Sequence, residues 1–89
     1  MGMRRRPIDR TAADVARSMS GGDDPATEEA AWIRSELVEA KIGHTYHAGP
    51  RTEWFTLHNP TERGQLWFLM YAPEWTWDSR SARYTRQIP

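Results

Sequence analysis

Cysteine is absent from this chain of 89 residues, and its absence excludes several classes of small protein. Disulfide scaffolds, zinc ribbons and thiol enzymes all need the thiol group, so packing alone must hold this fold together. Long hydrophobic runs are also missing, because the longest, Leu66 to Ala72, is far too short to cross a bilayer. The arginines near the N-terminus are not followed by the apolar region of a secretory signal. We therefore expect one small domain in the cytoplasm.

The chain has no net charge, but its charges are unevenly distributed. Residues 1–20 contain five Arg and two Asp, whereas residues 21–40 contain one Arg and six carboxylates. All 12 basic residues except Lys41 are Arg. A GC-rich gene accounts for that bias, and Arg is also the residue best suited to phosphate binding and interface ion pairs. The arginine content is therefore compatible with binding to nucleic acid and with binding to protein.

Two helices are predicted in the first half of the chain. Apolar residues recur at helical spacing over residues 8–19, before a Gly-Gly pair that should end the helix. A longer helix should begin after Asp24, a good N-cap, and end at Gly43. Trp32 lies on the acidic face of this second helix. It either packs under the N-terminal segment or is an exposed anchor for a partner.

A β-hairpin is predicted after the helices, from two mostly apolar runs joined by a polar turn. Its strands would be residues 52–58 and 65–71, and residues 44–48 and 74–78 can add one short strand each. We therefore predict an α+β fold in which two N-terminal helices pack on a small three- or four-stranded antiparallel sheet. The predicted parts of the chain are a disordered basic N-terminus (1–7), one α+β domain (8–78) and an Arg-rich C-terminal tail (79–89).

This predicted hairpin is apolar on both faces, although a surface hairpin needs only one apolar face. The face with Phe55 and Phe68 would lie against the helices. Trp75 and Trp77 could fold back over the other face, or that face could be a binding surface, since exposed apolar patches usually mark contacts. Aromatic residues are enriched at binding hot spots. The predicted protein-binding residues are therefore Trp54, Trp67, Leu69 and Tyr71, with Trp32 on the helix.

No residue pattern predicts catalysis or a bound cofactor. His44 and His47 are three apart on a strand and would point to opposite faces, and His58 has no cluster of carboxylates beside it. The Gly21-Gly22 pair is followed by two Asp, which would repel a phosphate. We therefore expect no enzyme activity, no metal and no cofactor.

The order of the elements resembles the end of a winged helix-turn-helix domain. Residues 11–17 look like a positioning helix, and residues 33–43 with the hairpin look like a recognition helix and wing. The second helix departs from that pattern, because it carries four Glu where a recognition helix would approach phosphates. The resemblance implies DNA binding, with Tyr84 among the C-terminal contacts. The basic residues that could bind nucleic acid are Arg4, Arg5, Arg6, Arg10, Arg80, Arg83 and Arg86.

Taken together, these patterns favour a small non-enzymatic protein that works by contact with another protein. The partner could be a different protein or a second copy of this chain. Compact single domains without catalytic motifs are typical of the regulators and inhibitors that phages and mobile elements encode. A winged-helix-like DNA-binding regulator is the alternative, and no membrane partner is expected.

Overall fold

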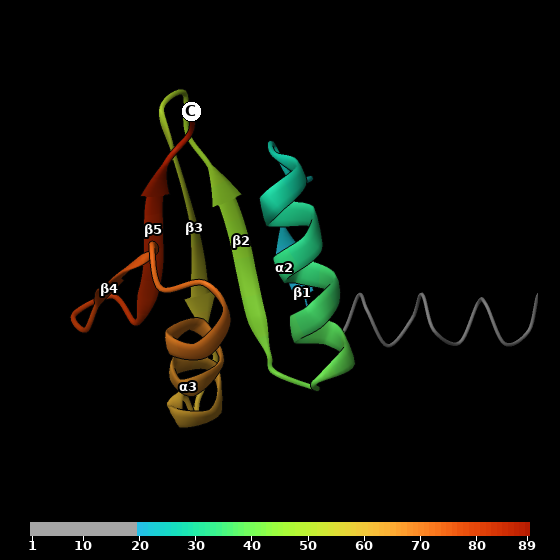
Figure 1. The fold of residues 1–89 in the computed structure, drawn as a ribbon, viewed down its shortest axis with the longest axis vertical. Helices are drawn as coiled ribbons and strands as arrows, with labels where there is room; N and C mark the ends of the chain where they lie inside the picture. Colours follow the sequence, from blue (N-terminus) through green and yellow to red (C-terminus); the bar gives the residue numbers. More distant parts are fainter. Residues whose placement is uncertain (1–19) are drawn as a thin grey trace, which may run out of the picture.

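The computed structural model describes residues 20–89, which form a five-stranded sheet and two helices (Figure 1). The sheet has the strand order β1-β2-β3-β5-β4. β1 runs parallel to β2, and every other neighbouring pair is antiparallel. In chain order the elements are β1 (Ser20–Gly22), α2 (Glu28–Glu39), β2 (His44–Ala48), β3 (Thr52–Leu57), α3 (Glu62–Tyr71), β4 (Thr76–Asp78) and β5 (Arg83–Gln87).

Both helices pack on the same face of the sheet. Burial alternates along β3, so Phe55 points toward the helices and Trp54 points away from them. The Phe55 ring lies 5.9 Å from Phe68 of α3, and Phe68 stacks on Tyr84 of β5 at 4.0 Å. α2 contributes Ile33 and other fully buried residues to the same core. The result is a two-layer domain with one helical side and one side of open sheet.

A buried polar cluster attaches the start of α2 to the sheet. The carboxylate of Glu53 is fully buried and accepts hydrogen bonds from the hydroxyls of Tyr46 at 2.7 Å and Thr27 at 3.0 Å. Arg86 forms an ion pair with the same carboxylate, with 2.6 Å between Nε and Oε2. Burial, chiefly, raises the pKa of Tyr46 to about 12, so its hydroxyl stays a donor. The pairing compensates the cost of burying a charge.

α2 begins and ends at residues other than those expected. Its N-cap is Thr27, whose hydroxyl accepts a hydrogen bond from the Ala30 amide at 3.1 Å. Asp24 lies too far upstream for that role, since the Glu53 carboxylate fixes Thr27 at the start of the helix. At the other end Lys41, not Gly43, adopts the left-handed conformation, with φ of 61°.

The second strand of the predicted hairpin is wrong, because residues 62–71 form α3. A run of apolar residues without alternation fits a buried helix as well as a strand. No residue between Glu62 and Tyr71 is β-branched, whereas every strand from β2 onward contains Thr. Leu, Met and Gln favour helices, and the spacing of Gly64, Phe68 and Ala72 gives α3 a buried stripe. The observed hairpin joins β2 to β3 instead.

The predicted fold class is therefore wrong in two respects. The described helices are not both N-terminal, because α3 follows β3, and the sheet is mixed and has five strands instead of three or four antiparallel ones. Residues 79–89, expected as a tail, contain β5, which pairs with both β3 and β4. The predicted first helix and the basic segment 1–7 lie outside the described residues. Across residues 20–89 there is no helix with the length and apolar character needed to cross a membrane.

Candidate functional site

The outward face of α3 is apolar. Leu66, Leu69 and Met70 are 57%, 70% and 60% exposed, although their residue types normally lie in protein cores. The cause is the sequence of the helix, which has only apolar or aromatic residues after Gln65. A helix that is apolar on every side cannot bury all of its residues against a single sheet. α3 therefore covers the core with one side and presents a hydrophobic surface with the other.

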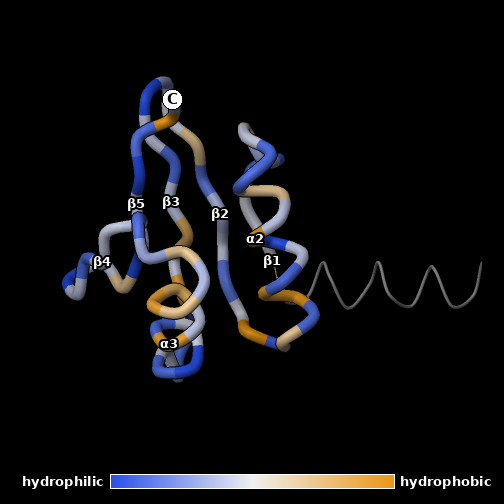
Figure 2. The backbone as a smooth tube through the Cα atoms, in the orientation of Figure 1, coloured by the Kyte–Doolittle hydropathy of each residue, from blue (hydrophilic) through white to orange (hydrophobic). Residues whose placement is uncertain are grey.

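Aromatic residues extend this surface from α3 onto α2. The Trp67 ring lies 5.6 Å from the Trp32 ring and 5.4 Å from the Tyr71 ring. Trp67 is nearly buried at 8% exposure, whereas Trp32 and Tyr71 are 45% and 56% exposed. Figure 2 shows hydrophobic residues in α3 and toward the end of α2. We call this region the α2–α3 apolar surface, formed by Trp32, Leu66, Trp67, Leu69, Met70 and Tyr71.

Two shallow hollows lie between the helices. Both are bordered by Ala40, Trp67 and Tyr71, so they are parts of one groove. The first is apolar apart from Arg63, and the second has Glu36 and Glu39 on its α2 side. The start of α3 lies beside the end of α2, since Arg63 donates to the Ala40 carbonyl at 2.7 Å. The groove thus has an apolar floor and an acidic edge.

The end of α3 meets the start of α2 through Trp75. Its indole N–H donates to the carboxylate of Glu29 at 3.1 Å. This hydrogen bond, chiefly, and the nearby guanidinium of Arg86 lower the pKa of Glu29, although partial burial acts against them. A charged Glu29 and the exposed Glu74 add negative charge at this end of the surface.

Four of the five predicted protein-binding residues meet on this surface, and Trp54 does not. Trp67, Tyr71 and Trp32 gather there because 65–71 is a helix beside α2, not because a hairpin presents them, while Leu69 extends the surface over the outer side of α3. Trp54 lies on the open face of the sheet, where Arg83 stacks over its ring at 5.0 Å. In a strand, Leu66 and Met70 would share the face of Phe68 that lies against the helices, whereas in the helix both are exposed.

Trp75 and Trp77, which in one of the two alternatives would cover the open face, lie on the helical side instead. Trp75 is buried, with its ring 5.4 Å from Phe55. Trp77 packs on Tyr84 with 4.8 Å between the rings. Neither α2 nor α3 lies on the face that contains Trp54. The open face presents Trp54, His47 and a set of threonines: Thr45, Thr52, Thr56 and Thr85.

The C-terminal residues predicted to bind nucleic acid mostly have structural contacts. Arg86 is paired with Glu53, and Tyr84 belongs to the core. Arg83 contacts Trp54, and Arg80 is exposed. Arg4, Arg5, Arg6 and Arg10 lie outside the described residues. In addition, α2 and the β2–β3 hairpin belong to one five-stranded sheet domain, which is not the winged-helix arrangement.

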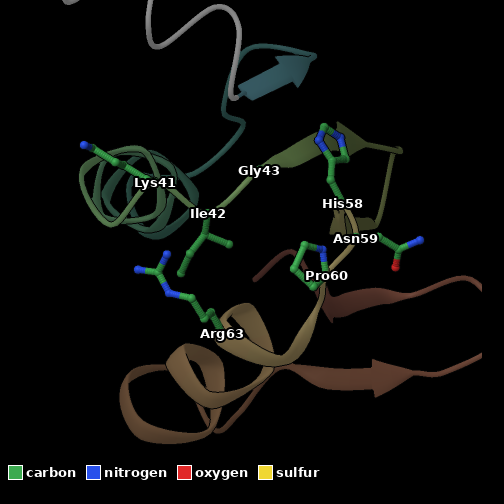
Figure 3. A pocket seen from close by; sticks show the side chains of 7 residues that line it. All are labelled: Lys41, Ile42, Gly43, His58, Asn59, Pro60 and Arg63. Atoms are coloured by element: carbon green, nitrogen blue, oxygen red, sulfur yellow. The ribbon is translucent and has the colours of Figure 1, made fainter.

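A further hollow lies beside the loop between β3 and α3 (Figure 3). It includes Ile42, His58 and Arg63, and in Figure 3 the Lys41 side chain points away from it. The His58 ring is 2.8 Å from the Thr45 hydroxyl, which gives it an ordinary surface contact. In the described part of the chain no three His, Asp or Glu residues are grouped closely enough to hold a metal ion.

The strongest candidate site in residues 20–89 is thus an apolar, aromatic surface with an acidic edge, which is suited to binding and lacks the paired groups of a catalytic centre. Comparison of the chain with known protein families, curated proteins and solved structures finds no match.

Proposed function

We propose that the protein is a small non-enzymatic binding protein that acts through protein–protein contact at the α2–α3 apolar surface. One observation carries this proposal: every exposed large hydrophobic side chain of residues 20–89 lies on that surface. Single exposed apolar residues are ordinary, whereas a contiguous group marks a contact site. The exposed group is Trp32, Leu66, Leu69, Met70 and Tyr71.

The shape of the surface favours a protein over a small molecule. Small-molecule sites are concave and enclose most of the ligand, but Leu66, Leu69 and Met70 project from the outside of a helix. Tryptophan and tyrosine beside a shallow groove resemble the anchors of protein interfaces, which combine large apolar area with a polar tip.

The charge around the surface favours a protein over a lipid membrane. Helices that lie on membranes carry Lys and Arg beside their apolar face, where they meet anionic lipids. Here Glu36 and Glu39 border the groove, and Arg63 is held against the end of α2. An anionic lipid surface would be repelled by that acidic edge.

Site-specific photo-crosslinking tests the proposal. A photoreactive residue at position 69 should form an adduct with one defined protein in the cells that produce this chain. The same residue at Gln87, which is exposed at the end of β5, is the matched control and should give no such adduct. Mass spectrometry identifies the partner. Equal labelling from both positions, or none from position 69, would contradict the proposal.

DNA binding remains the alternative that these observations favour less. It would depend on Arg4, Arg5, Arg6 and Arg10, since Arg86 is already paired. A DNA affinity that falls steeply with salt, and that survives substitution of Leu69, would support this alternative.

A further inference from the structure

We infer that the occupant of the α2–α3 apolar surface is an amphipathic helix with basic residues along its flank, supplied by a different protein. This inference rests on the proposed function and specifies its partner. The groove follows one side of α3 from Arg63 to Tyr71 beside the second half of α2, and a helix laid along such a groove buries its own apolar stripe there. Trp67 and Tyr71, which border both hollows, would contact that stripe.

The basic flank follows from the charges beside the groove. Glu36 and Glu39 border it on the α2 side, and Glu28 is exposed about two turns of helix before Glu36. Glu62 and Glu74 are exposed at the two ends of α3. Opposite charge across an interface improves specificity and the rate of association, while like charge opposes binding. An acidic rim thus selects a partner rich in Lys or Arg.

The cations near the groove do not reverse this selection. Arg63 is the basic residue within it, and its guanidinium already bonds to the Ala40 carbonyl. Lys41 lies at the same end and points away from the neighbouring hollow (Figure 3). Both cations are at the C-terminal end of α2, so the remaining length of the groove keeps its acidic edge.

A second copy of the chain is a poorer fit for the same surface. A two-fold interface uses the same patch on both subunits. Each copy would then bring its own Glu28, Glu36 and Glu39 into the contact, which doubles the negative charge around one apolar area. The apolar area alone would permit such pairing, and the acidic edge opposes it.

Fluorescence anisotropy with two synthetic peptides tests the inference on the full chain. Both peptides carry Leu at helical spacing, and they differ only in having Lys or Glu along the flanks. We expect the Lys peptide to bind about tenfold or more tightly at low salt, with the difference shrinking as salt is raised. Glu39→Lys should reduce that preference, while Asp24→Lys, an equal charge change at an exposed site before α2, should leave it largely intact.

The outcomes separate this inference from the proposed function. Equal binding of both peptides, abolished by Met70→Glu at the edge of the groove, would overturn the basic partner and leave the contact surface standing. Binding that ignores Met70→Glu, or no binding of the Lys peptide, would overturn the inference, and the crosslinking at position 69 then decides the proposed function by itself. A concentration-dependent dimer that Met70→Glu dissociates would make the occupant a second copy, which also overturns the inference.

Discussion

Glu53 is the residue on which the attachment of α2 depends most. Its carboxylate is fully buried between Thr27, Tyr46 and Arg86, and each of them supplies a hydrogen-bond donor. Thr27 serves twice, because its hydroxyl also caps α2. A protein without cysteine cannot stabilise this junction with a disulfide, so the polar cluster and the aromatic core must hold it.

Arg86→Met should destabilise the fold by about 3–5 kcal/mol, because it leaves the Glu53 carboxylate buried without its cation. Urea unfolding measures this loss. Arg80→Met removes an exposed arginine and should stay within about 0.5 kcal/mol of the wild type. Similar small losses in both variants would show that Arg86 does not compensate a buried charge.

His44 makes stability depend on pH. The ring is fully buried, its Nδ1–H donates to the Ile42 carbonyl at 2.8 Å, and Nε2 has no hydrogen-bond partner among the described residues. Burial, aided by the nearby charges of Arg34 and His58, lowers the pKa of His44 below its usual 6.5. The unfolded chain therefore binds a proton at a pH where the folded chain does not.

The free energy of unfolding should consequently be higher above pH 6.5 and should fall as the pH drops below 6.5 toward the lowered pKa of His44. His44→Phe removes the titrating group and should flatten the curve in this range, even if the loss of the Ile42 hydrogen bond lowers its overall level. Chemical unfolding at a series of pH values checks this. An unchanged slope in the variant would assign the pH dependence to other groups.

At the scale of elements, α3 shows what the sequence could and could not predict. Strand β3 and the second helix were expected, with shifted ends, because alternation and helical spacing are visible without tertiary information. Residues 65–71 were assigned to a strand because their apolar run fits both structures. The missing β-branched residues and the stripe of Gly64, Phe68 and Ala72 were the available signals.

The candidate site was predicted in part, for a related reason. Residue type identified Trp32, Leu69 and Tyr71, since large exposed aromatic and aliphatic side chains mark contacts wherever they lie. Which other residues share a surface with these three depends on whether 65–71 is a strand or a helix. The predicted strand therefore groups Trp54 with them and leaves Leu66 out. The role of Arg86 could not be predicted, because its partner Glu53 is 33 residues away and the two meet only through the β3–β5 pairing.

The two sides of α3 should respond differently to truncation. Phe68→Ala should cost about 3–5 kcal/mol, because the ring is fully buried against Phe55 and Tyr84. Leu66→Ala should cost less than about 1 kcal/mol, since 57% of that residue is exposed. Thermal unfolding compares the two. Equal losses would mean that both sides of α3 belong to a core.

At the scale of the whole molecule, the domain has two unlike sides. The helical side carries the α2–α3 apolar surface and the acidic edge, while the open sheet carries threonines around Trp54 and Arg83. Because the net charge is zero, the protein as a whole has no electrostatic field of a single sign. The charges on each side therefore decide which partners approach that side. The apolar surface is therefore the side on which we expect the biological contact.

The Leu69→Glu variant tests this expectation most directly. The measurement is the affinity of the purified variant for the protein that is crosslinked at position 69. We predict that the affinity falls about thirtyfold or more, equivalent to about 2 kcal/mol, while the unfolding free energy stays within about 0.5 kcal/mol of the wild type. An unchanged affinity would contradict the assignment of the α2–α3 apolar surface as the contact site. A variant that unfolds would instead show that Leu69 belongs to the core, although 70% of the residue is exposed in the structure.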